Sequence, residues 1–309
     1  MDYQQRTLRD EVSCTGIGLH SGQKVRLYIK PAPPDSGIRF VRKDLPSQPV
    51  IDASSENVVD TNLCTVLGSN GTRVSTIEHL MAALFGLGID NAWVEIEGPE
   101  VPIMDGSSAP FIFLLNSTGI RKQRAPKRFF VIRKVFKVNE GNRFVYIYPS
   151  KELKITYTID FQHPLLRNQM YELCFSGKEF INEISRARTF GFLKDVQTLR
   201  ENGLAKGGSL DNAIVIDDFR IINEGGLRYK DEFVRHKVLD FIGDLAILGA
   251  PIIGHFVVRK SGHSLNQSTL KGLLANQKCW KELTFQNPEE CQQNRVKIPA
   301  FGSLEPMPA

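Results

Sequence analysis

Residues 233–248 constrain the fold of this chain more than any other segment. Most of them are apolar, which predicts a buried helix. Yet His236, Asp240 and Asp244 recur at intervals of four residues, and this spacing puts all three on one stripe of that helix. Carboxylates on a buried helix cost free energy unless they are paired or bind a metal. The stripe is therefore either part of a cation site or a polar face that solvent covers.

A second helix, predicted over residues 75–85, offers complementary chemistry at its start. Glu78 and His79 stand beside its apolar stripe, and a hydrolytic metal site needs a third ligand and a base. The same segment matches the S-x-x-E pattern of a capping box, in which Glu78 would only satisfy backbone N–H groups. The residues alone leave both interpretations of Glu78 open.

A third candidate follows a predicted strand over residues 252–258. His263 stands next to Gly262, where it could lie at the mouth of a site or belong to an ordinary turn. Asp244 is a candidate partner for its imidazole, since a nearby carboxylate orients a histidine ring and raises its pKa.

The two halves of the chain resemble each other in pattern. Residues 78–97 and 236–259 both run from a helix with metal-type residues through Leu-Gly into a strand. Aligning the Leu-Gly pairs puts His79 opposite Asp240, as a duplication would, although helix–Gly–strand patterns also arise by chance. A basic segment at 121–127 is the expected linker, and the Pro-rich stretch after Asn287 is the expected loose tail.

Composition limits the classes of partner. The 309 residues suit about two domains, and 41% of them are hydrophobic. The net charge of +5 suits an anionic ligand such as a pyrophosphate. The sequence lacks the concentrated basic stripe that nucleic-acid binding would need, so we do not expect a nucleic acid as partner. The five scattered cysteines predict neither a disulfide framework nor a thiolate zinc site. The sequence contains no membrane-length apolar stretch and its N-terminus lacks a secretory signal, so we expect a cytoplasmic protein.

Several short segments, taken in order, identify a family. They are GIGLHSG at 16–22, STIEH at 75–79, VPIMDG at 101–106, SRARTFGF at 185–192, and HKVLD at 236–240 followed by SGH at 261–263. Together they resemble the UDP-3-O-acyl-N-acetylglucosamine deacetylase family (LpxC), the zinc amidase of lipid A synthesis in Gram-negative bacteria. The resemblance covers residues from about 5 to 280.

The resemblance implies roles for particular residues. It makes His79, His236 and Asp240 the ligands of one catalytic Zn²⁺, a site that would also accept Fe²⁺. The implied catalytic residues are Glu78 as general base, His263 as general acid, Asp244 as its partner, Thr189 at the oxyanion, and Lys237 near the substrate. The implied substrate contacts are His20, Phe161, Phe190, Lys260 and, by an approximate match, Arg143. The implied acyl passage contains Leu193, Val196, Ser209 and Val215.

The resemblance also implies an α+β fold of two similar domains, each a β-sheet with helices, with the helices sandwiched between the two sheets. The expected boundaries are 1–124 for the first domain, 128–286 for the second with an acyl-chain insert at about 192–217, and 287–309 for a polar tail. The expected reaction is hydrolysis of the N-acetyl group of UDP-3-O-(3-hydroxyacyl)-N-acetylglucosamine by a monomer that neither binds nucleic acid nor inserts into a membrane. The alternatives are a zinc amidohydrolase acting on another N-acetyl sugar and a non-catalytic ligand- or RNA-binding protein.

Overall fold

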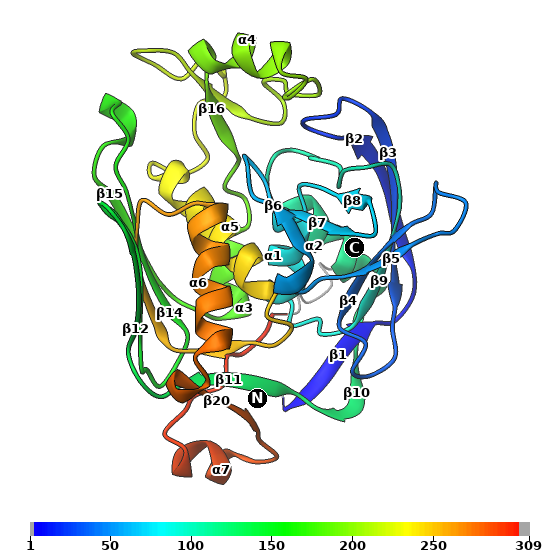
Figure 1. Cartoon of the computed structure of the whole chain (residues 1–309), viewed down its shortest axis with the longest axis vertical. Coiled ribbons are helices and arrows are strands. Elements are labelled where there is room, and N and C mark those ends of the chain that lie inside the picture. Colours follow the sequence, from blue (N-terminus) through cyan, green and yellow to red (C-terminus); the bar gives the residue numbers. More distant parts are fainter. Residues whose placement is uncertain (1–2, 303–309) are drawn as a thin grey trace, which may run out of the picture.

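A computed structural model describes residues 3–302 as two facing β-sheets with helices between them (Figure 1). The first sheet has five strands. In spatial order they are β2 (Val12–Ile17), β3 (Lys24–Pro31), β9 (Ala92–Glu97), β4 (Ile38–Arg42) and β5 (Val50–Asp52). The second sheet also has five strands. They are β12 (Phe136–Glu140), β13 (Arg143–Tyr148), β19 (His255–Arg259), β14 (Lys154–Ile159) and β15 (Gln169–Cys174).

Each sheet has one buried face, and the sequence of its strands explains why. Side chains alternate between buried and partly exposed along β9 and along β14. Because successive side chains of a strand point to opposite faces, this alternation buries one apolar face and leaves the other to solvent. The helices between the sheets cover both apolar faces.

The helices fall into a central group and a peripheral group. The central group is α1 (Glu78–Gly86), α2 (Ala109–Thr118), α3 (Gly177–Glu179), α5 (Glu232–Ala246) and α6 (His263–Ala275). The peripheral helices are α4 (Leu193–Glu201) and α7 (Pro288–Gln293), at opposite ends of the molecule in Figure 1. Helices α1 and α5 pack directly on each other, and every residue of α1 is buried. Among residues 3–302, no helix is both long enough and apolar enough to cross a membrane.

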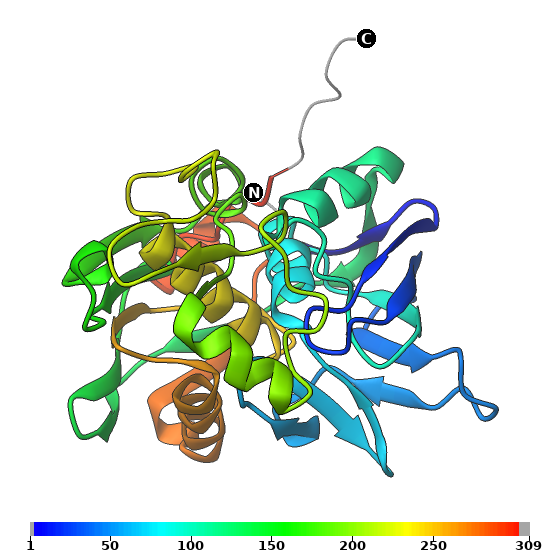
Figure 2. The same cartoon turned by 90° about the horizontal axis from the view of Figure 1, so that it is seen from above.

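Smaller sheets complete the molecule. The first half carries β6 (Val58–Asp60), β7 (Val66–Ser69) and β8 (Thr72–Val74), and the second half carries β16 (Phe190–Phe192) and β17 (Ile214–Ile216). The remaining strands are β1 (Gln4–Leu8) with β10 (Ile120–Pro126), and β11 (Arg128–Ile132) between β18 (Ile252–Ile253) and β20 (Trp280–Thr284). Seen from above, α4 lies across one end of the central helices (Figure 2).

The two halves share one topology. In both five-stranded sheets the third strand is antiparallel to the second and parallel to the fourth. In both, this third strand follows the central helix, α1 or α5, along the chain. Gly88 and Gly249 follow these helices with φ of 66° and 73°, a left-handed conformation that glycine adopts without steric cost. The repeat seen in the sequence therefore corresponds to a repeated structural unit.

The expected α+β sandwich is confirmed, but two connecting segments differ from expectation. The basic segment at 121–127 is no free linker, because most of it forms β10 and pairs with β1. The segment after Asn287 contains α7 and buries Val296, Ile298 and Phe301. These apolar side chains stand among polar and proline residues, so the composition of the segment did not predict their burial. Residues 303–309 of the expected tail lie outside the described residues.

Candidate active site

A cleft of about 670 Å³ is lined by residues from both halves of the chain. The first half contributes His20, Thr76, Glu78, His79 and Ile103, among others. The second half contributes Arg143, Phe161, Thr189, Phe190, Phe192, His236, Lys237, Asp240 and His263, among others. Because titratable side chains of both halves meet here, the cleft is the candidate active site.

At the floor of the cleft, two histidines and one aspartate bring their donor atoms together. One ligand atom each from His79, His236 and Asp240 lies within 4.8 Å of the other two, and all three residues are buried. The Nε2 atoms of His79 and His236 lie 3.5 Å and 3.2 Å from Oδ1 of Asp240. Two imidazole nitrogens and a carboxylate oxygen form a donor set that zinc and iron accept.

The chemistry of His236 fits a metal ligand. Its Nδ1 lies 3.0 Å from the carbonyl oxygen of Ala187, so Nδ1–H donates there and Nε2 keeps its lone pair for a metal. Burial lowers the pKa of His236 to about 4, which keeps the ring neutral near pH 7. Burial opposes the charge on Asp240, but His236 and Lys237 outweigh burial and hold the pKa of that carboxyl well below its usual value. The residues present therefore fit a divalent cation.

Glu78 does not form the capping box that its sequence matches. Helix α1 begins at Glu78 without any side-chain cap, and Thr76 has a φ of 57° that no helical turn adopts. One carboxylate oxygen of Glu78 instead accepts a hydrogen bond from the Thr65 N–H at 3.1 Å. The side chain is buried at the cleft, and burial raises its pKa. Glu78 is thus free of the capping role and available as a base.

His263 pairs with Asp244, as the sequence suggested. Its Nδ1 lies 2.9 Å from Oδ2 of Asp244, and its Nε2 lies 3.9 Å from a carboxylate oxygen of Glu78. Burial alone would lower the pKa of His263, but these carboxylates, Asp244 above all, raise it to about 9. The imidazole is therefore protonated at neutral pH and can donate a proton.

Two further residues bind the carboxylate of Asp244, and neither was predicted from the sequence. Thr65 donates its hydroxyl hydrogen to Oδ1 of Asp244 at 2.6 Å, and Asn266 donates to Oδ2 at 2.7 Å. Thr65 comes from a loop between β6 and β7 in the other half of the chain. Nothing in its local sequence marks it, because the contact with Asp244 spans 179 residues of chain.

Most of the residues expected near the substrate line the cleft, but Lys260 does not. Phe161 and Phe190 line it in edge-to-face contact, with ring centroids 5.8 Å apart. His20, Arg143 and Thr189 line it as well, and burial lowers the pKa of His20. Lys260 is not among the lining residues, and its Nζ lies 3.3 Å from a carboxylate oxygen of Asp160.

The cleft is lined by a different face of α4 from the one expected for the acyl passage. This helix lines the cleft with Asp195, Thr198 and Leu199. The residues named from the sequence, Leu193, Val196, Ser209 and Val215, are not among the lining residues. Helical periodicity explains this for Leu193 and Val196, since positions 195, 198 and 199 share a face that 193 and 196 do not, while Ser209 and Val215 lie outside α4.

Comparison with known sequences decides the family. The sequence model described as "UDP-3-O-acyl N-acetylglycosamine deacetylase" (LpxC) matches residues 5–275. The chain belongs to this family.

Proteins named UDP-3-O-acyl-N-acetylglucosamine deacetylase are similar to it over most of their length. The protein of Myxococcus xanthus (strain DK1622) is 53% identical over 90% of this chain and 89% of its own length. Those of Acidithiobacillus ferrooxidans (strain ATCC 53993 / BNL-5-31) and Haemophilus influenzae (strain 86-028NP) are 53% and 50% identical, over 91% and 95% of this chain and 93% and 97% of their own lengths.

The LpxC assignment confirms the resemblance drawn from the short segments and makes the chain a hydrolase of a metal-dependent family. The buried group of His79, His236 and Asp240 can hold that family's metal ion. The identity of the metal and the role of each side chain are argued below from the chemistry of the cleft.

Proposed function

We propose that this LpxC chain hydrolyses the N-acetyl group of UDP-3-O-(3-hydroxyacyl)-N-acetylglucosamine, the committed step of lipid A biosynthesis, with one zinc ion. One observation carries this proposal. The donor atoms of His79, His236 and Asp240 converge within 4.8 Å, beside Glu78 and His263 in one cleft. A binding protein would not need a base and a protonated histidine next to such a group.

His79, His236 and Asp240 would hold the metal ion, and Glu78 would act as the base for the attacking water. When bound, zinc supplies Lewis acidity that polarises the amide carbonyl and activates water near neutral pH. Glu78 accepts the proton of the attacking water, and its burial, which raises its pKa, makes it a stronger base than an exposed carboxylate. A carboxylate oxygen of Glu78 lies 3.9 Å from His263 Nε2, so the proposed base and the proposed acid stand next to each other in the cleft.

Two further groups act after the attack. The hydroxyl of Thr189, at the edge of the cleft, donates a hydrogen bond to the developing oxyanion. His263 is protonated near pH 7 and gives its proton to the departing nitrogen, so that the C–N bond breaks to yield acetate and the free amine. Lys237, whose pKa is raised by Asp240 against the effect of burial, adds a positive charge beside the site.

The substrate-binding roles follow the lining of the cleft. Phe161 and Phe190 offer aromatic faces to the sugar, and Arg143 offers a cation to the pyrophosphate. His20 is assigned to polar groups of the nucleotide sugar, and Lys260, which does not line the cleft, is assigned to a part of the substrate that extends beyond it. The acyl chain leaves along the face of α4 formed by Asp195, Thr198 and Leu199, whereas Leu193, Val196, Ser209 and Val215 of the same insert do not line the cleft.

The first test measures metal content together with acetate release, for the wild type and for His236→Ala. About one zinc per chain in the wild type is expected, with metal and activity both lost in the variant. Iron in place of zinc would keep the mechanism and change the ion. A wild type without metal and without chelator-sensitive activity would reject the proposal. A substrate lacking the acyl chain, assayed in parallel, should react far more slowly if the passage along α4 is used.

A further inference from the structure

The loop at residues 185–189 contacts two parts of the active site at once. The carbonyl oxygen of Ala187 accepts the Nδ1–H of His236 at 3.0 Å. Two residues further on, Thr189 lines the cleft. Because this loop meets both a metal ligand and the proposed oxyanion position, its placement bears on the geometry of each.

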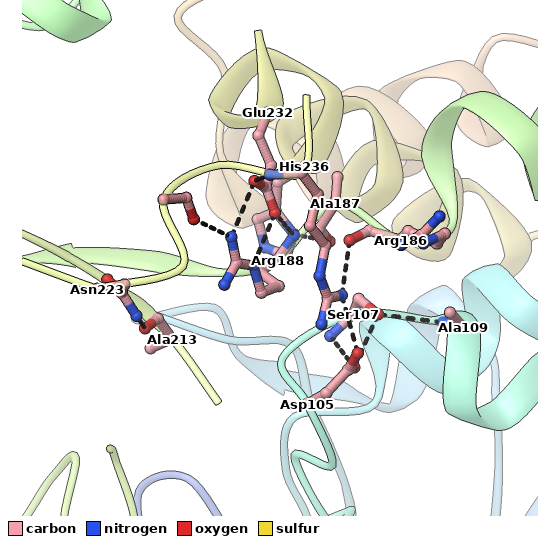
Figure 3. A network of polar contacts seen from close by, with 12 residues as sticks. Asp105, Ser107, Ala109, Arg186, Ala187, Arg188, Ala213, Asn223, Glu232 and His236 are labelled. Atoms are coloured by element: carbon pink, nitrogen blue, oxygen red, sulfur yellow. Dashed lines mark hydrogen bonds and ion pairs between the residues drawn. The ribbon is translucent and has the colours of Figure 1, made fainter. Parts of the chain in front are cut away.

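A buried carboxylate ties this loop to the helix that carries the ligand. Glu232 is the first residue of α5, one helical turn before His236, and its side chain is fully buried. Its Oε1 accepts hydrogen bonds from the backbone N–H and from Nε of Arg188, at 3.0 Å and 2.9 Å. Its Oε2 lies 3.1 Å from Nη2 of the same guanidinium. Figure 3 shows this ion pair beside Ala187 and His236.

Further contacts join the same loop to the first half of the chain. Thr189 N–H donates to the carbonyl oxygen of Gly106 at 2.8 Å, and Ser108 N–H donates to that of Ser185 at 3.0 Å. Arg228 donates both to the carboxylate of Asp105 and to the carbonyl oxygen of Arg186, within 2.9 Å. The loop is therefore anchored from both halves, and the Arg188–Glu232 pair joins it to α5 alongside the hydrogen bond from His236 to Ala187 (Figure 3).

We propose that the Arg188–Glu232 ion pair is a positioning device for the metal centre, an inference that rests on the proposed function. The bidentate contact sets the distance between the loop and the first turn of α5, and so presents the Ala187 carbonyl to the His236 Nδ1–H. That hydrogen bond fixes the tautomer and the plane of the ring, which aims Nε2 toward Asp240. Neither Arg188 nor Glu232 lines the cleft, so both act through His236 and Thr189.

A second interpretation gives Glu232 a purely structural role. A carboxylate in the first turn of a helix stabilises that helix through its dipole, whatever the carboxylate contacts elsewhere. Asp231 separates the two ideas. It stands next to Glu232 at the same helix end and pairs with an arginine, Arg235 at 2.6 Å, but that arginine does not belong to the 185–189 loop. Asp231→Asn is therefore the matched control for Glu232→Gln.

The experiment measures the Zn²⁺ dissociation constant by chelator competition, and the visible spectrum of the Co²⁺-substituted full chain. Outer hydrogen-bond partners of metal ligands typically change metal affinity by about 10- to 100-fold. We expect Glu232→Gln to raise the dissociation constant about 10-fold or more and to alter the Co²⁺ spectrum. Arg188→Lys keeps the charge but loses the bidentate contact, so a smaller rise is expected. Asp231→Asn should match the wild type in both readouts.

Each outcome separates this inference from the proposed function. Wild-type affinity and spectrum in a folded Glu232→Gln protein would overturn the positioning role while leaving the metal centre intact. An equal loss in Asp231→Asn would overturn it too, because the effect would then belong to the helix end in general. If Glu232→Gln does not fold, Arg188→Lys decides between the same outcomes. A wild type that binds no metal would reject the proposed function, and this inference with it.

Discussion

The two halves of the molecule share a topology but differ in what their central helices carry. Helix α1 presents Glu78 and His79 in its first turn, whereas α5 presents His236, Asp240 and Asp244 along two turns. Their inserts differ as well, since the first half has three short strands before α1 and the second has β16, α4 and β17 before α5. A repeated scaffold thus brings two helices together, and the differences between the repeats supply the chemistry.

The two metal-type histidines illustrate the difference. His236 gives its Nδ1–H to the carbonyl of Ala187, while Nδ1 of His79 is buried with no hydrogen-bond partner among residues 3–302. His79 is instead tied through its backbone, because the Ser108 hydroxyl donates to its carbonyl oxygen at 2.8 Å. A hydrogen bond to its ring therefore orients His236, whereas the hydrogen bond at His79 fixes only its backbone.

The largest expected effect comes from the base that only the first half provides. Glu78→Gln removes the proton acceptor and nearly preserves size, so kcat should fall roughly 100- to 10,000-fold. Zinc content should stay near one per chain, since Glu78 is not one of the three converging donors. Steady-state acetate release with metal analysis tests this. Full turnover in the variant would move the base to another residue.

The next effect concerns the acid that only the second half provides. Asp244 is the main cause that raises the pKa of His263 to about 9, against the effect of burial. A protonated general acid works below its pKa, so wild-type activity should decline as the pH rises through about 9. In Asp244→Asn the pKa falls and the alkaline limb of kcat/KM should move down by about 1–3 pH units. An unshifted limb would mean that another group titrates there.

A third prediction tests the packing that joins the halves. A Cβ placed on Gly243 of α5 would lie 2.1 Å from the carbonyl oxygen of Glu78, so Gly243→Ala must push the two helices apart. We expect a loss of about 1–3 kcal/mol in the free energy of unfolding, together with lower kcat.

Gly272→Ala in α6 is the control for this packing variant. Its added Cβ meets only the far end of the Phe136 ring, at 3.0 Å, so its unfolding free energy should change by less than about 1 kcal/mol. Urea unfolding of both proteins measures the difference. Equal stability of the two variants would show that α1 and α5 can separate without cost.

The smallest expected effect tests the contact between halves that Thr65 makes. Thr65→Val removes the hydroxyl donor to Asp244 and should cost about 1–2 kcal/mol of unfolding free energy, with a several-fold loss of kcat. Thr156→Val is the control, because that half-buried hydroxyl contacts sheet residues away from the cleft, Glu172 at 3.3 Å and His255 Nε2 at 2.9 Å. Matching kcat and unfolding midpoints in the two variants would show that Asp244 does not need this donor.

Local patterns in the sequence indicated candidate site residues, whose roles stay predictions, but did not indicate which distant segments pair. The spacing of His236, Asp240 and Asp244 marked one helix stripe, and periodicity alone fixes which side chains share a face. The alternative that Glu78 belongs to a capping box was wrong, because Thr76 adopts a left-handed backbone. The Thr76 hydroxyl bonds to Glu100, a contact 24 residues away that the local sequence does not show. The segment expected as a linker at 121–127 forms most of β10, which local composition does not predict because its partner strand, β1, lies more than a hundred residues away in the sequence.

The sequence by itself determined the family, the two central helices and the residue types of the metal centre, since these are encoded in local patterns and ordered motifs. Only the tertiary structure decided which groups meet. The Thr65 hydroxyl on Asp244, the Ala187 carbonyl on His236 and the Glu232 carboxylate on Arg188 join segments 44 to 179 residues apart. Such contacts follow from how the two sheets close over α1 and α5, because burial forces each polar group to find whichever partner the packing brings near.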